Sequence, residues 1–215
     1  MIRPGVLVRR SFGRYERQVA ETYRRLFVDL DDLAERMAGW VSEPHRILEI
    51  GCGEGAMTER LARIYEGAMI TAIDITPDVG RLFRSDAAHR VTFLHETADA
   101  LADREPASFD LIVLCDVMHH VLPLARQGLL YAARRLLAPD GNLLFKDWSP
   151  SAAPIHWLCF MADRYITGDK VRYATVEKTR TLLSDVFGYG AVHVESRIRP
   201  WSNNYVFLVH PGLSN

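Results

Sequence analysis

The stretch Leu48-Glu49-Ile50-Gly51-Cys52-Gly53-Glu54-Gly55, residues 48–55, decides how the rest of the chain is interpreted. An apolar run at 46–50 leads into it, and helical periodicity at 57–64 follows it. Glycines between a strand and a helix let the backbone turn sharply and approach a ligand closely, and the helix start offers unpaired N–H groups. The sequence therefore predicts a ligand-binding loop, although the glycines could also serve the turn alone.

The spacing of this loop distinguishes between classes of ligand. Its glycines follow the pattern G-x-G-x-G, whereas a dinucleotide fingerprint is G-x-G-x-x-G with the pyrophosphate on the helix. Glu49 stands two residues before Gly51, and a carboxylate there does not suit a pyrophosphate. It suits a ligand that carries an ammonium group, so an NAD-dependent oxidoreductase is disfavoured.

Two more acidic residues follow the next two predicted strands. Asp74 ends the run 69–74 and could accept both hydroxyls of a ribose, while Asp99 follows the run 91–95 and could accept an adenine amine. Each has an alternative role as a helix cap, Asp74 before a helix predicted from Pro77 onward to residue 83 and Asp99 in the short helix after it. Together with Glu49 they describe a ligand with an amino acid end, a ribose, an adenine and no phosphate. That ligand is S-adenosylmethionine.

Short apolar runs alternate with helical stretches through the middle of the chain. The runs predicted as strands are 46–50, 69–74, 91–95, 109–116 and 142–147, with a helix over 122–137 before the last. Such alternation is typical of βαβ units and a parallel sheet covered on both faces. After a helix predicted over 176–187, the runs 191–196 and 204–209 indicate an antiparallel pair.

Five segments in order carry a resemblance to a known family. They are LEIGCGEG, AIDIT, TADAL, FDLIVLCDVMHHV and LLAPDGNLLFKDW, and they lie within residues 45–148. On these motifs the chain resembles the Rossmann-like S-adenosylmethionine-dependent methyltransferases of the small-molecule type. The resemblance implies an enzyme with an α/β fold, in which a three-layer, doubly wound sheet has seven strands in the order 3-2-1-4-5-7-6 with strand 7 antiparallel.

The resemblance also implies which residues bind the cofactor, S-adenosyl-L-methionine. They are Glu49, Gly51, Cys52, Gly53, Gly55, Asp74, Ile75, Asp99, Ala100, Cys115 and Asp116.

Two segments fall outside the alternation of strands and helices. Apolar residues recur at helical spacing over 15–40, and an apolar helix is predicted over 155–166. We expect both segments to cover the acceptor site. The expected division of the chain is an N-terminal arm and cap helix (1–44), a methyltransferase core (45–147 and 174–215) and a helical insert over the acceptor site (148–173).

Aromatic side chains in these segments suggest the kind of acceptor. The residues expected to contact it are Tyr23, Trp148, His156, Trp157, Phe160 and Tyr165. They favour an aromatic or lipid-like small molecule, although packing in the core is about as common for any one of them.

Methyl transfer from a sulfonium is an in-line displacement that depends mainly on positioning. A general base is needed only when the acceptor atom is protonated. The candidates are His119, His120 and Asp147, which follow the fourth and fifth predicted strands, where ligands bind open α/β sheets. Adjacent helical residues point about 100° apart, so one histidine, preferably His119, is expected to face the acceptor while the other packs. Asp147 could instead only stabilise its loop.

Composition excludes several other classes of protein. The net charge is −1, with 48% hydrophobic and 25% charged residues, which is typical of a globular domain and lacks the basic excess of a dedicated nucleic-acid binder. Three distant cysteines form neither a disulfide framework nor a metal clip, so we expect no metal and a reducing, cytoplasmic setting. No apolar run reaches the length of about 18 residues that a membrane span needs, and no secretory signal is expected.

The leading interpretation is a methyltransferase that acts on oxygen, nitrogen or carbon of a small acceptor in specialised metabolism. The alternative is an enzyme for a macromolecule or for an acyl group on a carrier protein, and only a basic arm of Arg3, Arg9, Arg10 and Arg14 supports it. A non-catalytic protein with this scaffold is less consistent with the intact glycine loop and acidic residues.

Overall fold

A seven-stranded sheet organises the computed structural model, which describes residues 13–162 and 171–212. Its strands are β1 (Arg46–Ile50), β2 (Met69–Asp74), β3 (Val91–His95), β4 (Phe109–Cys115), β5 (Leu137–Trp148), β6 (Val192–Arg197) and β7 (Asn204–Val209). Their order is β3-β2-β1-β4-β5-β7-β6. Strands β1 to β5 are parallel, and β7 runs antiparallel to both of its neighbours. The predicted order and direction are confirmed.

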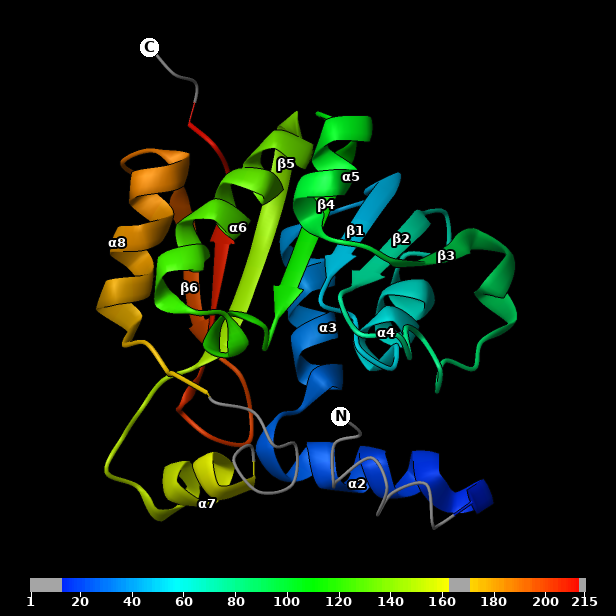
Figure 1. The fold of residues 1–215 in the computed structure, drawn as a ribbon, viewed down its shortest axis with the longest axis vertical. Helices are drawn as coiled ribbons and strands as arrows, with labels where there is room; N and C mark the ends of the chain where they lie inside the picture. The colour runs from blue at the N-terminus through cyan, green and yellow to red at the C-terminus, as the bar shows by residue number, and fades with distance from the viewer. Residues whose placement is uncertain (1–12, 163–170, 213–215) are drawn as a thin grey trace.

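Helices cover both faces of this sheet (Figure 1). On one face lie α5 (Ala98–Arg104), α6 (Pro123–Leu136) and α8 (Val176–Phe187), and on the other lie α3 (Leu30–Trp40) and α4 (Ala56–Ile64). Each face buries its own apolar cluster. The central strand β4 is nearly all apolar because it contributes side chains to both clusters.

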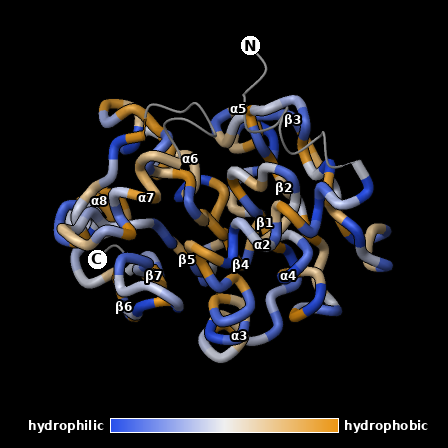
Figure 2. The backbone as a smooth tube through the Cα atoms, turned by 90° about the horizontal axis from the view of Figure 1, so that it is seen from below, coloured by the Kyte–Doolittle hydropathy of each residue, from blue (hydrophilic) through white to orange (hydrophobic). Residues whose placement is uncertain are grey.

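Two further helices lie beyond the carboxyl ends of the parallel strands. They are α2 (Glu16–Phe27) and α7 (Pro154–Ala162), drawn below the sheet in Figure 1. Figure 2 looks onto this end of the molecule and shows β1, β4 and β5 at the centre with helices around them. Ligands of open α/β sheets bind at this end. Among the described residues no helix has the length and apolar character needed to cross a bilayer.

The prediction of one continuous helix over 15–40 is wrong, because the structure divides this segment into α2 and α3. Val28 and Asp29 between them have extended backbones. The Asp29 carboxylate accepts the backbone N–H groups of Asp31 and Asp32, which makes it the N-cap of α3. The break lets α2 turn away from the sheet face and cross the carboxyl ends of the strands.

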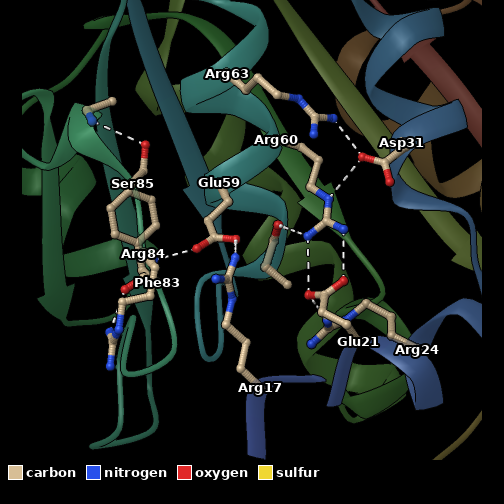
Figure 3. A network of polar contacts seen from close by, with 12 residues as sticks. Arg17, Glu21, Arg24, Asp31, Glu59, Arg60, Arg63, Phe83, Arg84 and Ser85 are labelled. Carbon is tan, nitrogen blue, oxygen red and sulfur yellow. Dashed lines mark hydrogen bonds and ion pairs between the residues drawn. The ribbon is translucent and has the colours of Figure 1, made fainter. Parts of the chain in front are cut away.

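Ion pairs connect α2 to the helices α3 and α4 of the core (Figure 3). Arg60 of α4 donates to Glu21 of α2 at 2.8 Å and to Asp31 of α3 at 3.3 Å. Arg17 pairs with Glu59 at 2.6 Å. Arg60 is buried, so removing the carboxylates that it binds would leave an uncompensated charge and cost more than the loss of a surface ion pair.

A second correction concerns the helix predicted from Pro77 to residue 83, which forms successive turns instead. Asp74 therefore does not cap a helix. Its carboxylate accepts the backbone N–H groups of Thr76 at 2.8 Å and of Gly53 at 2.7 Å. Gly80 turns with φ +65°, and a Cβ there would lie 2.5 Å from the ring of Phe93.

Three other boundaries differ from the expectation. The strand predicted at 142–147 begins earlier, at Leu137. Thr97, and not Asp99, is the N-cap of α5, because its hydroxyl accepts the N–H of Ala100. The helix predicted over 155–166 is present as α7 at Pro154–Ala162, and the remainder of that prediction lies outside the described residues.

Candidate functional site

A cavity of about 290 Å³ lies between α2 and the carboxyl ends of β1, β4 and β5. Ten of the residues singled out in the sequence line it, namely Tyr23, Glu49, Gly51, Cys52, Gly53, Cys115, Asp116, His119, His120 and Trp148. They come from α2, the glycine loop and the ends of two further strands, so the fold brings together residues that are far apart in the chain.

The glycine loop leaves room for a ligand at its centre. Gly53 has φ +51°, and a Cβ built on it would meet no protein atom within 4 Å. Gly51 is required for packing instead, since a Cβ there would lie 2.3 Å from Cγ2 of Val117. Gly55 has φ +94° and is the N-cap of α4. Gly53 therefore exposes its backbone to the cavity, as a residue that cradles a ligand must.

Glu49 is a buried acid on the cavity wall. Burial raises its pKa to about 7 against the lowering effect of a hydrogen bond from the Thr58 hydroxyl, and the nearby Asp74 carboxylate raises the pKa further. The Thr58 hydroxyl donates at 2.6 Å and carries no charge. A carboxylate in such a place is stabilised by a ligand that brings a positive charge. The site therefore fits the ammonium group of an amino acid.

Five of the predicted cofactor residues do not line this cavity. They are Gly55, Asp74, Ile75, Asp99 and Ala100. Asp74 is half-buried at the end of β2, while Ile75, Asp99 and Ala100 are exposed. Ile75 follows β2, and Asp99 and Ala100 lie in α5, whereas Gly55 is buried at the start of α4.

His119 and Asp147 form a buried pair. Nδ1 of His119 lies 2.5 Å from Oδ1 of Asp147, and the N–H of Trp148 donates to the same oxygen at 2.7 Å. Burial alone would raise the pKa of Asp147, but His119, this backbone N–H and Lys146 outweigh it and lower the pKa. An ionised Asp147 accepts a proton-bearing Nδ1, which leaves Nε2 of His119 as the basic nitrogen. Asp147 does not line the cavity, whereas His119 does.

The expectation that only one histidine faces the cavity is wrong. Both His119 and His120 line it, and their ring centroids are 4.1 Å apart. They lie in a single 3-10 turn, Met118–His120, and not in the middle of an α-helix, so the angular argument from helical spacing does not apply. They still differ in burial, because His119 is buried and His120 is exposed.

A second charged pair lies beside the first. Nζ of Lys146 lies 2.6 Å from both carboxylate oxygens of Asp116. Asp116, His119 and Asp147 each place one atom within 4.8 Å of the others, the one such grouping of possible metal ligands in the described part of the chain. The Lys146 ammonium binds both oxygens of Asp116, and a cation there would be repelled by it. These side chains do not fit an open metal site.

Aromatic residues from α2 and from the end of β5 also line the cavity. Tyr23 and Phe27 of α2 make an edge contact at 5.3 Å, and Phe27 makes another with Trp148 at 6.4 Å. Trp148 donates its indole N–H to Nδ1 of His156 at 3.0 Å. His156 itself does not line the cavity.

The insert contributes less to the cavity than expected. Trp157 and Phe160 of α7 are exposed and do not line it. The cavity residue from α7 is Cys159, whose Sγ lies 3.5 Å from the hydroxyl of Tyr173. Tyr165, Arg3, Arg9 and Arg10 lie outside the described residues.

Comparisons with known proteins agree with this geometry. Residues 47–141 match the family model of a methyltransferase domain. The ubiquinone biosynthesis O-methyltransferase of Xanthomonas campestris pv. campestris is 36% identical over 130 residues, which are 59% of this chain and 51% of that protein. The protein of the same name from Klebsiella pneumoniae subsp. pneumoniae is 30% identical over 116 residues, 53% of this chain and 46% of that protein. The chain spans about half the length of the curated relatives it matches.

A solved structure extends the likeness to nearly the whole chain. The 1,6-didemethyltoxoflavin-N1-methyltransferase of Burkholderia thailandensis, crystallised with 1,6-didemethyltoxoflavin and S-adenosylhomocysteine, has a TM-score of 0.67. The match covers 98% of this chain and 91% of that one at 19% identity, so it concerns the fold. Residues 47–141 are thus similar in sequence to a methyltransferase domain, and the fold is similar to that of a methyltransferase crystallised with S-adenosylhomocysteine.

Several residues of this site were not among the sequence predictions. Arg24, Phe27, Lys146 and Asn204 line the cavity, and Tyr173 stacks on His119 with ring centroids 5.0 Å apart. The sequence could have indicated two of them, since Phe27 shares a helix face with Tyr23 and Lys146 directly precedes Asp147. The sequence could not have indicated Asn204, because its amide donates to the carbonyl of Phe27 at 2.7 Å and the two residues are distant in sequence.

Proposed function

We propose that the chain is a methyltransferase that transfers the methyl group of S-adenosylmethionine to a hydroxyl of a small aromatic acceptor. The observation that carries this proposal is the His119–Asp147 pair on a cavity with an aromatic wall. A hydroxyl is protonated at neutral pH and needs a base, and a neutral imidazole held by a carboxylate is suited to that task.

The cofactor would lie across the glycine loop. Glu49 would bind its ammonium group, and Gly53 would leave space for its methionine end. Asp74 would accept the ribose hydroxyls with the lone pairs that its two backbone hydrogen bonds leave available. Ile75, Asp99 and Ala100 would contact the adenine, which the open surface beside β2 can accommodate. The bound cofactor supplies an electrophilic methyl group on a sulfonium.

The acceptor would lie between the aromatic wall and His119. Tyr23, Phe27 and Trp148 offer ring faces and edges to a flat molecule. Nε2 of His119 would take the hydroxyl proton, and Asp147 would stabilise the resulting imidazolium. His120 would be a neighbour of the acceptor and not the base. Both the names of the curated relatives and this arrangement support oxygen as the methylated atom.

The segments outside the core would act as a cap. The division into an arm and cap helix over 1–44, a core over 45–147 and 174–215, and an insert over 148–173 is part of this proposal. Helix α2 supplies four cavity residues, Ala20, Tyr23, Arg24 and Phe27. A cap that excludes water would hold the hydroxyl in line with the methyl group.

The test is the release of S-adenosylhomocysteine in the presence of a panel of acceptors. The panel pairs each phenol or catechol with the aniline of the same shape, and it includes hydrophobic and water-soluble members. We expect turnover with a phenol and little with the matched aniline. Turnover confined to anilines, or to acyl groups on a carrier protein, would contradict the proposal.

A further inference from the structure

His119 lies between two carboxylates. Asp147 binds its Nδ1 at 2.5 Å, and Asp116 places an oxygen within 4.8 Å of a ring nitrogen of His119 and of a carboxylate oxygen of Asp147. An opposite charge at about 4–6 Å shifts a pKa by about 1–3 units toward the charged form. If both carboxylates acted unopposed, the imidazole would therefore hold a proton at neutral pH and could not take one from an acceptor.

Lys146 opposes one of these carboxylates. Its Nζ binds both oxygens of Asp116 at 2.6 Å, and the residue is 1% exposed. An ammonium group loses much hydration free energy on burial, so its placement calls for an explanation. Burial alone would lower the pKa of Lys146, but the Asp116 carboxylate outweighs it and raises the pKa, which keeps the ammonium charged.

The backbone holds this pair in a fixed position. The N–H of Asp116 donates to the carbonyl of Lys146 at 2.9 Å, in addition to the contact between their side chains. Asp116 also has φ +57°, in the left-handed region that aspartate enters more readily than most residues other than glycine. In this conformation its carboxylate lies against Lys146.

We propose that Lys146 is a positioning residue that sets the proton affinity of His119 by neutralising Asp116. This goes beyond the proposed base role of His119 and rests on it only for the consequence in turnover. The ammonium cancels the field of Asp116 at the ring, and Asp147 is left as the carboxylate that selects the tautomer. His119 is thereby kept neutral, with Nε2 as its basic nitrogen.

Other groups near His119 define the background of this effect. Among the described residues, the charged, titratable or aromatic groups near it include Asp147 and Lys146 from β5, Asp116 after β4, His120 in the same turn, Arg172 and Tyr173 before α8, and Arg126 of α6, whose charge acts on Asp147. The variants below leave all of these except the Lys146–Asp116 pair unchanged.

Removing Lys146 alone and removing Asp116 alone should shift the pKa of His119 in opposite directions. In Lys146→Met the Asp116 carboxylate acts alone, so the pKa of His119 rises by about one unit or more. In Asp116→Asn the ammonium acts alone, so the pKa of His119 falls. The double variant has no charge at either position and returns the pKa of His119 toward that of the wild-type protein. A pair that only ties β4 to β5 would not produce shifts of opposite sign.

The experiment is an NMR titration of the histidine side chains in the full chain, with His119 assigned from the missing signal in His119→Gln. It needs no acceptor, so its outcome is separate from the outcome of the acceptor panel. Lys146→Arg, which keeps the charge, serves as the matched control and should titrate like the wild-type protein. Replacing both members of a buried ion pair is tolerated better than removing one, so the double variant and the single variant that still folds keep the test usable if the other single variant unfolds.

Opposite shifts in the two single variants, with reversal in the double variant, support the proposal. If one single variant unfolds, the result that supports it is a shift of the predicted sign in the other single variant, with reversal in the double variant and a wild-type titration in Lys146→Arg. Shifts in the same direction, no shift at all, or a double variant that differs from the wild-type protein by more than about one unit would overturn it.

Discussion

Nδ1 of His119 lies 2.5 Å from Oδ1 of Asp147, and only the histidine of the two reaches the cavity. Asp147 therefore acts from behind the ring. It is placed to fix the tautomer of His119 and to stabilise its protonated form, while Nε2 remains the basic nitrogen. The proposed chemistry depends on this relationship more than on any other contact in the site.

Removing the imidazole should slow methyl transfer to a hydroxyl. We expect His119→Ala to lower kcat by a factor of about 10²–10⁴, the usual contribution of a general base. Asp147→Asn should lower kcat as well, because an amide can stabilise the wrong tautomer. His120→Ala is the matched control and should cost much less. Binding of S-adenosylhomocysteine, measured by calorimetry, should stay within a few-fold in all three variants.

Glu49→Gln should affect stability and cofactor binding in opposite directions. The pKa of Glu49 is raised from 4.5 to about 7 in the folded protein. The folded protein thus holds this proton more tightly than the unfolded chain does, and the stability so gained is full below pH 4.5 and is lost as the pH rises through about 7. At pH values above about 8, Glu49→Gln should therefore raise the free energy of unfolding of the cofactor-free chain, by about 3 kcal/mol at most.

The same carboxyl group makes cofactor binding depend on pH. Affinity for S-adenosylhomocysteine should rise between about pH 5.5 and 7.5, where the ligand's α-amino group stays protonated and Glu49 becomes ionised. Glu49→Gln should bind the ligand weakly and without this dependence. A wild-type affinity that is flat across this range, measured by calorimetry, would show that Glu49 does not bind the ammonium group.

Asp74→Ala should weaken cofactor binding through two losses. The carboxylate would no longer accept the ribose hydroxyls, at a cost of about 1.5–3 kcal/mol, and it would release the N–H of Gly53. Affinity should fall by a factor of about ten or more. Asp99→Ala removes an exposed acid at the adenine end and serves for comparison. Equal affinities of wild-type and Asp74→Ala proteins would remove Asp74 from the site.

Deletion of residues 1–20 tests the cap. It removes Glu16 and Arg17, whose ion pairs with Arg81 and Glu59 hold the start of α2 against the core. We expect turnover to be abolished while S-adenosylhomocysteine binds within a few-fold of the wild-type affinity. A truncated protein that turns over normally would show that α2 does not cover the acceptor.

The sequence predicted the sheet better than it predicted the cavity. The parallel strands and their helices follow from the alternation of short apolar runs with helical stretches, which is a local signal, and β7 in particular has the predicted bounds. The order of the strands was implied by the family resemblance. The break before α3 depends on Asp29, a local signal that the long apolar periodicity concealed. The exposure of Trp157 could not be predicted, because apolar periodicity does not distinguish a face that lines a pocket from one that faces solvent.

The contact between His119 and Asp147 shows the same limit of sequence-based prediction. His119 and Asp147 were each candidates because they follow neighbouring strands, but no pattern in the sequence states that one binds the other. Their contact depends on the parallel pairing of β4 with β5, in which Cys115 lies opposite Lys146. Lys146 was overlooked for the same reason, since its partner Asp116 follows a different strand.

The most direct test of the account is to follow the transferred methyl group itself. Wild-type protein and His119→Ala are incubated with S-adenosylmethionine labelled with ¹³C at the methyl carbon and with the best phenol of the acceptor panel, and the labelled product is examined by NMR. The account predicts a ¹³C-methyl group on the phenol oxygen in the wild-type reaction and a rate lower by a factor of about 10² or more in His119→Ala. A label on nitrogen or carbon, or equal rates for the two proteins, would contradict it.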